Sequence, residues 1–179
     1  MLSGDFTETS DSMVKAVCDA GPIIHLDELK CLELLADFEE IIIPFAVEKE
    51  IEKHRPSALQ NSDLHFKKLS VRRSISDNLM TFCQIFSLDS GETEALSFME
   101  KNPKAIFFTD DAAARLVAEQ MRFKVHGTIG VIIRSIRRKQ KKPETVFNIL
   151  KHIPEKSTLH VKPSVLEEIL FKIKKEFHI

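Results

Sequence analysis

The chain has 179 residues, of which 43% are hydrophobic and 30% are charged, and its formal net charge at pH 7 is −1. This length fits one domain with a core large enough to be stable without disulfides, and the composition excludes disordered, fibrous and polycationic chains. A nucleic-acid-binding surface would therefore have to be a local patch.

The ends of the chain and its cysteines bear on where the protein is found. Residues 1–12 are rich in Ser, Thr and acidic side chains, which predicts a flexible lead-in without the pattern of a secretory signal. No later apolar run is long enough to cross a bilayer. Cys18, Cys31 and Cys83 have no metal-ligand spacing, which is typical of buried thiols in a reducing compartment. We therefore expect a cytoplasmic protein with no membrane partner.

Strand and helix patterns alternate along the first part of the chain. The apolar residues 13–18 predict a strand, and the spacing of apolar residues over 23–38 predicts one or two helices. The β-branched run Ile41–Ile43 predicts a buried strand, because such residues suit a pleat and disfavour a helix. Pro44 then favours a helix that extends to about Lys53.

This last helix carries several acidic residues. Val47 and Ile51 are expected to face the sheet, and Glu50 lies on the flank of the same apolar stripe. Glu48 and Glu52 lie farther round, so we expect them to be ordinary surface charges.

The middle of the chain gives weaker patterns. Residues 58–66 are expected to form another helix, and Leu69 and Val71 an edge strand between basic residues. Residues 75–86 fit a helix. A further helix begins near Leu88, where Asp89 and Glu92 have the spacing of a capping box.

The stretch from Lys104 to Gln120 is the most informative in the chain. Ala105–Phe108 is short, apolar and partly aromatic, as a strand buried on both faces should be. Asp110 and Asp111 follow it directly, and helical spacing begins after them. Open parallel sheets bind ligands at such junctions, although an Asp at this position is also a common helix N-cap.

The end of the chain predicts one more strand over residues 123–126 and a glycine-flanked helix over 131–139, followed by terminal helices over 143–153 and 163–177. The alternation predicts an α/β three-layer domain over residues 13–140, with a mainly parallel sheet flanked by helices. Residues 141–179 form a C-terminal helical extension, packed on the domain or on a partner.

A basic run lies at the end of the helix over 131–139. Six basic side chains fall within nine residues: Arg134, Arg137, Arg138, Lys139, Lys141 and Lys142. Such a run is more often a solvated helix end, favoured by the helix dipole, than a binding surface. It is nevertheless a candidate patch for nucleic acid.

Acidic residues recur at equivalent places in this predicted fold. Asp19, Asp110 and Asp111 all follow predicted strands, and the carboxyl ends of parallel strands share one edge of a sheet. Glu50 and Glu92 lie on predicted helices that follow or precede these strands. Carboxylates that converge repel one another unless a cation is present, and acids without His or Cys favour Mg²⁺ or Mn²⁺. Such a site suits phosphodiester hydrolysis.

An ordered set of motifs resembles the PIN domain, and most closely its prokaryotic branch similar to VapC-type toxins. The motifs are Val17–Gly21, Ile43–Ile51, Gly91–Leu96, Phe108–Arg115 and Val125–Gly130, and the resemblance covers about Val14 to Lys139. It implies a Mg²⁺- or Mn²⁺-dependent ribonuclease, often a homodimer, and in toxin–antitoxin pairs an antitoxin protein as partner.

The resemblance also assigns residues to the site. Asp19, Glu50, Glu92, Asp110 and Asp111 match the catalytic and metal-ligating acids, although VapC-type toxins usually have Asp where this chain has Glu92. Which of Asp110 and Asp111 is the ligand stays open. The candidate substrate-binding residues are Arg115, Thr109 and Thr128, and for Arg115 an ion pair with a site acid is the favoured alternative.

Three functions remain open at this point. The first is a metal-dependent endonuclease acting on single-stranded or looped RNA, because a splayed backbone reaches a cleft more easily than a duplex does. The second is a catalytically inactive PIN-like module that binds RNA or a protein. The third is a phosphoacceptor signalling domain, which would need a Lys partner that we cannot place.

Overall fold

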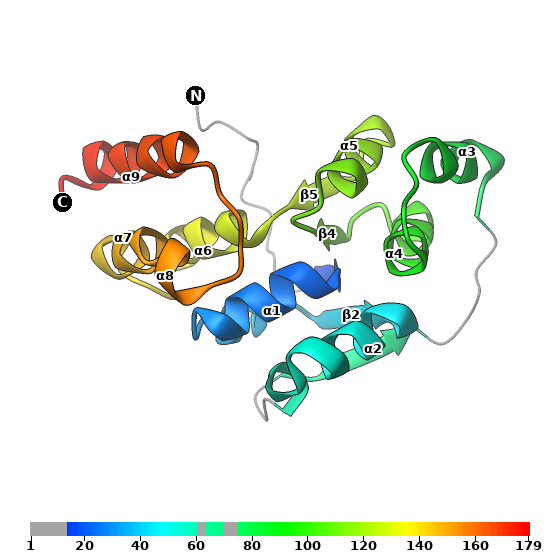
Figure 1. Ribbon diagram of the computed structural model, residues 1–179, viewed down its shortest axis with the longest axis horizontal. Coiled ribbons are helices and arrows are strands. Elements are labelled where there is room, and N and C mark those ends of the chain that lie inside the picture. The colour runs from blue at the N-terminus through cyan, green and yellow to red at the C-terminus, as the bar shows by residue number, and fades with distance from the viewer. Residues whose placement is uncertain (1–13, 61–63, 70–74) are drawn as a thin grey trace.

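The computed structural model describes residues 14–60, 64–69 and 75–179, and within them five strands form one parallel sheet (Figure 1). The strand order is β3-β2-β1-β4-β5. The strands are β1 (Lys15–Cys18), β2 (Glu40–Pro44), β3 (Phe66–Leu69), β4 (Ile106–Phe108) and β5 (Lys124–His126). The predicted α/β fold with a central parallel sheet is therefore confirmed.

Helices cover both faces of this sheet. They are α1 (Ala20–Glu28), α2 (Phe45–His54), α3 (Asp77–Ile85), α4 (Ser90–Lys101), α5 (Ala112–Gln120), α6 (Thr128–Arg137), α7 (Pro143–Lys151), α8 (Ile153–Lys156) and α9 (Pro163–Phe177), with 3-10 turns η1 (Leu32–Leu35) and η2 (Pro56–Gln60). One face packs against α1, α2, α6 and the terminal helices, and the other against α3, α4 and α5. These are the three layers that the alternation of patterns predicts.

The strands are apolar on both sides because each side faces a layer of helices. In β2, Ile41 and Ile43 belong to the core under α1 and α6, whereas Ile42 belongs to the core under α4. In β4, Phe108 faces the first core and Phe107 the second, as the alternation of side chains along a strand requires. The sheet is therefore held from both sides, and its carboxyl edge has a fixed position.

The helix predicted over residues 58–66 is wrong. The 3-10 turn η2 ends at Gln60, and strand β3 begins at Phe66. Ala58 and Leu64 are both buried in the core, although neither lies in an α-helix. The edge strand expected at Leu69 is present, whereas Val71 and the lead-in over residues 1–12 lie outside the described residues.

The terminal helices share their core with the sheet. Val146 of α7, with Leu166 and Ile173 of α9, is buried in the same cluster as the strand residues. The connection between α8 and α9 is tied to α1, because Ser157 Oγ and the N–H of Thr158 each donate to Glu28 at 2.7 Å. The extension is thus packed on the described domain.

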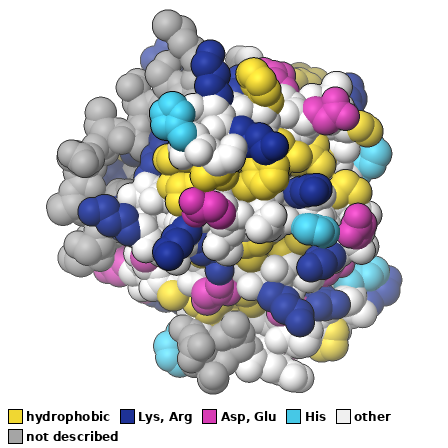
Figure 2. All heavy atoms as spheres, turned by 90° about the vertical axis from the view of Figure 1, so that its left-hand side faces the viewer, with side chains coloured by type: hydrophobic (Ala, Val, Ile, Leu, Met, Phe, Trp, Pro, Cys, Tyr) yellow, Lys and Arg dark blue, Asp and Glu magenta, His cyan; other side chains and the backbone are white. Residues whose placement is uncertain are grey.

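An apolar groove separates α6 from α9. It is lined by Ile133, Ile136, Arg137, Ile169, Lys172, Ile173, Glu176 and Phe177. Figure 2 views the molecule from this side and shows hydrophobic side chains across its middle, with Lys and Arg around them.

Two expectations from composition can be compared with the structure. Cys18, Cys31 and Cys83 are free and buried, as predicted. In the described part of the chain, no helix is long and apolar enough to span a bilayer.

Candidate active site

The carboxyl edge of the sheet brings together side chains that are far apart in sequence. The N–H of Asp19, just past β1, donates to the carbonyl of Phe108 in β4 at 2.9 Å. The N–H of Thr109 then donates to the carbonyl of His126 in β5 at 3.0 Å. Asp19 and Thr109 therefore lie side by side where β1 and β4 end, as parallel pairing predicts.

Asp19 is held by two hydrogen bonds. Its Oδ1 accepts from the N–H of Ala20 at 2.8 Å, which caps helix α1. Its Oδ2 accepts from Thr109 Oγ1 at 3.0 Å. The side chain is therefore fixed in direction before any ligand binds.

Asp111 caps the next helix at this edge. Its Oδ1 accepts from the N–H groups of Ala113 and Ala114, both at 2.8 Å, so the helix-cap explanation for this residue is confirmed. Its own N–H donates to Thr109 Oγ1 at 3.1 Å. Thr109 thus links Asp19 to Asp111 through one hydroxyl group.

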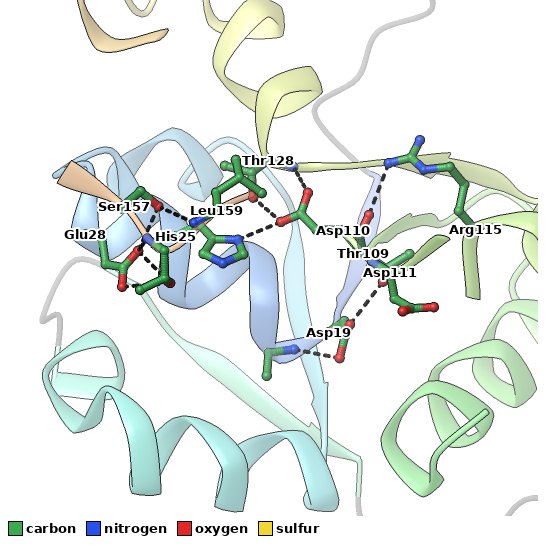
Figure 3. A network of polar contacts seen from close by, with 12 residues as sticks. Asp19, His25, Glu28, Thr109, Asp110, Asp111, Arg115, Thr128, Ser157 and Leu159 are labelled. Carbon is green, nitrogen blue, oxygen red and sulfur yellow. Dashed lines mark hydrogen bonds and ion pairs between the residues drawn. The ribbon is translucent and has the colours of Figure 1, made fainter. Parts of the chain in front are cut away.

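Asp110 points away from Asp19, toward α1 and α6 (Figure 3). Its Oδ2 accepts from His25 Nδ1 at 2.8 Å and from Thr128 Oγ1 at 2.5 Å, and its Oδ1 accepts from the N–H of Thr128 at 2.8 Å. Burial alone would raise the pKa of Asp110, but the hydrogen bonds from His25 and Thr128 outweigh it and lower the pKa. Both of its oxygens are engaged within the protein.

The start of α6 leaves no room beside Asp110. A Cβ atom on Gly127 would lie 2.6 Å from Asp110 Oδ1 and 2.7 Å from Arg115 Nη2. A side chain at position 127 would therefore displace Asp110 or Arg115 from its present position.

Glu92 lies on the first turn of α4 and is only 8% exposed. It forms the predicted capping box with Asp89: Glu92 Oε2 accepts from the N–H of Asp89 at 3.0 Å, and Asp89 Oδ1 accepts from the N–H of Glu92 at 2.8 Å. The helix start packs closely on α2, since a Cβ atom on Gly91 would lie 2.9 Å from Val47 Cγ2. This packing places Glu92 toward the edge where Asp19 lies.

Burial and the charges of nearby carboxylates together change the pKa values of two of these acids. Burial, with the charges of Asp89, Asp111 and Asp19, raises the pKa of Glu92 to about 7. Burial, with the charges of Asp89 and Glu50, raises the pKa of Asp19 to about 6. We call these five residues, Asp19, Glu50, Asp89, Glu92 and Asp111, the acidic cluster.

Membership of the acidic cluster differs from the predicted set at two positions. Asp89 is a member that sequence reasoning explained by its capping role alone. Asp110, which was predicted as a ligand, instead bonds to His25 of α1 and Thr128 of α6. Glu50 is solvent-exposed on α2 and contributes through its charge near Asp19.

The donor chemistry of the acidic cluster fits a hard divalent cation. All five members offer carboxylate oxygens, which Mg²⁺ and Mn²⁺ prefer, and a cation would relieve the repulsion that raises the pKa values of Asp19 and Glu92. Among the described residues, no three His, Cys, Asp or Glu side chains stand at the spacing of a closed metal site. Side chains of the acidic cluster would therefore have to draw together around an ion.

The residues predicted to bind substrate have structural contacts. Thr109 and Thr128 are fully buried, and their hydroxyls donate to Asp19 and Asp110. Arg115 Nη2 donates to the carbonyl of Thr109 at 3.2 Å, and in the described chain Arg115 forms no ion pair with an acid, so the favoured ion pair is wrong. A role for these residues in substrate binding stays a prediction.

Two other charged groups also differ from expectation. Glu48, predicted on the helix surface, is 7% exposed and pairs with Lys68 of β3 at 2.5 Å. In the basic run, Arg134 is buried against Asp37 and Lys141 pairs with Glu33. Much of the basic run is therefore engaged in holding α6 against the rest of the domain.

Comparison with known proteins assigns this arrangement to a family. The family model DUF3368, described as a PIN domain, matches residues 15–175. A search of curated proteins gave no match.

Proposed function

Because the chain belongs to the PIN domain family, we propose that it is a ribonuclease that hydrolyses phosphodiester bonds with Mg²⁺ or Mn²⁺ held by the acidic cluster. PIN domains are generally nucleases that act on nucleic acids and typically use divalent metals. The family gives the reaction class, and the arrangement of carboxylates supports the finer proposal.

The single observation that carries the proposal is the crowding of like charges at the sheet edge. Asp19 and Glu92 are largely withdrawn from water, and other carboxylates raise the pKa of each. Burying unpaired acids together destabilises a fold, and such perturbed groups gather at functional sites. A divalent cation would remove this cost and give the acids a catalytic use.

Each residue has a part in the proposed mechanism. Asp19, Glu92 and Asp111 would hold the metal, which lowers the pKa of a bound water and stabilises charge on the phosphate oxygens. Thr109 aligns Asp19 with Asp111 through its hydroxyl, and Asp89 orients Glu92 through the capping box. To Glu50, exposed on α2 with its charge acting on Asp19, we assign the orientation of the attacking water.

The adjacent acids Asp110 and Asp111 have different contacts. The negative charge of Asp111 contributes to the raised pKa of Glu92. Of its two carboxylate oxygens, only Oδ1 accepts a hydrogen bond from a donor in the described part of the chain. Asp110 has neither property, because it joins His25 to Thr128. We assign ligation to Asp111 and a positioning role to Asp110.

The test is cleavage of a single-stranded RNA oligonucleotide with Mn²⁺, comparing the wild type with Asp19→Asn, Asp111→Asn and Glu52→Gln. Loss of a residue that merely supports a ligand typically costs about 10- to 100-fold, so loss of a ligand should reduce the rate by about 100-fold or more. Glu52→Gln removes an exposed acid from the helix that carries Glu50 and should leave the rate unchanged. Equal cleavage by Asp19→Asn and the wild type would contradict the proposal.

A catalytically inactive module is the second candidate, and it is favoured by Glu92, which stands where VapC-type toxins usually have Asp. In that case Mn²⁺ would not raise the melting temperature, whereas RNA binding would persist and weaken steeply with salt. A melting temperature that rises with Mn²⁺ in the wild type and not in Asp111→Asn would exclude it.

The finer implications of the resemblance stay predictions. They are membership of the VapC-like branch, a toxin role with an antitoxin partner, a homodimer and a cytoplasmic location. Light scattering of the purified chain tests the dimer directly.

A further inference from the structure

An exposed aromatic side chain begins the helix that carries Glu50 of the acidic cluster. Phe45 is the first residue of α2, directly after the last residue of β2, and is 55% exposed. Leaving a large apolar side chain in water forgoes about 1.5–3 kcal/mol of burial. Its position at the site edge makes it a candidate for contact with a ligand.

The sheet register fixes how near Phe45 is to Asp19. Val17 of β1 lies opposite Ile42 of β2, so two residues farther along Asp19 is level with Pro44. Neighbouring strands are about 4.8 Å apart and successive residues about 3.3 Å, which puts the Cα atoms of Phe45 and Asp19 roughly 6–8 Å apart. A nucleic-acid strand bound at Asp19 would therefore run close to the backbone of Phe45.

The surroundings of Phe45 are charged. Lys49 Nζ lies 4.4 Å from the centroid of the Phe45 ring, and Lys68, 65% exposed in its side chain, pairs with Glu48 on the same helix. A protein-docking surface would be expected to offer a contiguous apolar patch, and the helix neighbours here are Glu48, Lys49 and Glu52. An isolated ring beside lysines matches the needs of an unpaired nucleotide, which presents a flat base and a negative phosphate.

We propose that Phe45 is a stacking platform for an unpaired nucleobase of the substrate, with Lys49 contacting the adjoining phosphate. This inference rests on the proposed function, and it adds a base-binding position to that site, with one residue for the base and one for the phosphate. A duplex keeps its bases stacked inside and would offer no free base to the Phe45 ring.

The composition of the chain allows a direct optical test, because it has no Trp and no Tyr. In Phe45→Trp the indole would be the only strong fluorophore, and stacking on a base should quench it. The probe is a short single-stranded oligoribonucleotide in EDTA, where metal-dependent cleavage does not occur. The control is Phe171→Trp, which places the indole at a position that is 67% exposed on α9.

We expect saturable quenching in Phe45→Trp, none in Phe171→Trp, and none from an oligonucleotide of equal length that has abasic sugars. Phe45→Ala should weaken binding of the intact oligonucleotide about tenfold, within the usual range for loss of one stacked base. Because Phe45 is exposed, the melting temperature of the Phe45→Ala protein should match that of the wild type.

Several results would overturn the inference. They are unchanged Phe45→Trp emission while anisotropy reports a bound oligonucleotide, equal quenching by the abasic probe, or no binding at low salt. Cleavage with Mn²⁺ is assayed separately on the same proteins. Quenching without cleavage would uphold the platform and contradict the nuclease proposal, whereas metal-dependent cleavage without quenching would do the reverse.

Discussion

Two charged regions of this molecule differ in the signs of the charges that they bring together. At the carboxyl edge of the sheet, the acidic cluster gathers like charges, and burial and repulsion raise the pKa values of Asp19 and Glu92. Where α6 meets the segment before β2, Arg134 donates to Asp37 at 3.0 Å and stacks on Phe38 with 4.5 Å to the ring centroid.

The difference separates charges that stabilise the fold from charges that serve a site. Arg134 is 5% exposed, and its buried guanidinium is neutralised by Asp37, which also accepts from Arg138 at 3.0 Å. No cation pairs with Asp19 or Glu92 in the described chain. Mutations should therefore have opposite effects on stability in the two regions.

The largest effect is expected for Arg134→Met. Breaking a buried pair by removing one partner usually costs 3–5 kcal/mol, and we expect about 3 kcal/mol because Arg138 still contacts Asp37. Urea denaturation at pH 7 measures this free energy of unfolding. A loss below about 1 kcal/mol would show that Arg134 is no more than a surface charge.

The same contrast between a stabilising charge and a site charge is expected for two adjacent residues, Asp110 and Asp111, when each is replaced by Asn. Asp110→Asn loses charge-assisted hydrogen bonds to His25 and Thr128 and should destabilise the fold by about 2 kcal/mol. Asp111→Asn should cost less than about 1 kcal/mol, the usual value of one cap, while abolishing Mn²⁺ binding. Calorimetric titration with Mn²⁺ provides the second measurement, and retained binding in Asp111→Asn would reverse our assignment.

Asp19→Asn should have the opposite sign in metal-free buffer. Removing one negative charge from the acidic cluster relieves repulsion and burial cost, and one pKa unit corresponds to about 1.4 kcal/mol. We expect an increase of about 1–2 kcal/mol in the free energy of unfolding at pH 7.5 with EDTA. With saturating Mn²⁺ the order should invert, since only the wild type gains from the ion.

The smallest effect is a pH dependence that isolates Glu92. Its pKa is raised from 4.5 to about 7 in the folded protein, so the folded state binds a proton more tightly than the unfolded state does. Stability in EDTA should therefore rise as pH falls through 7, by roughly 0.5–1 kcal/mol between pH 8 and 6.5 relative to Glu92→Gln.

The comparison with Glu92→Gln is needed because His126 acts in the other direction. Burial and the charges of Arg115, Arg134 and Lys124 lower its pKa to about 4, so protonation of the unfolded chain below pH 6.5 reduces stability. The difference between wild type and Glu92→Gln removes this shared contribution. Parallel pH profiles for the two proteins would contradict a raised pKa at Glu92.

The sequence predicted those features of the fold that depend on local pattern. Ile41–Ile43, Pro44 and the capping box at Asp89 and Glu92 fall where the structure has a strand, a helix start and a cap. The prediction of a helix over 58–66 was wrong. Phe66 belongs to a strand because it pairs with Ile41 of β2, and this pairing cannot be seen in the local sequence.

The site was less predictable because its details depend on contacts between distant residues. Adjacent residues at a strand tip point in different directions, and Asp110 is distinguished from Asp111 only by His25, 85 positions away, and by Thr128. Glu48 is buried because Lys68 reaches it from the neighbouring strand. These contacts join residues far apart in the sequence, so the spacing of residues within one segment does not predict them.

Strand β3 has one further consequence, for how the protein avoids aggregation. It is an outer strand of the sheet, and its two central residues, Lys67 and Lys68, are exposed and ion-paired to Glu40 and Glu48. Lysines on an outer strand discourage a second sheet from joining there, because an added strand would cover their exposed side chains and remove the charged groups from water. Acetylating or replacing both lysines should therefore make β3 a nucleus for intermolecular sheet growth.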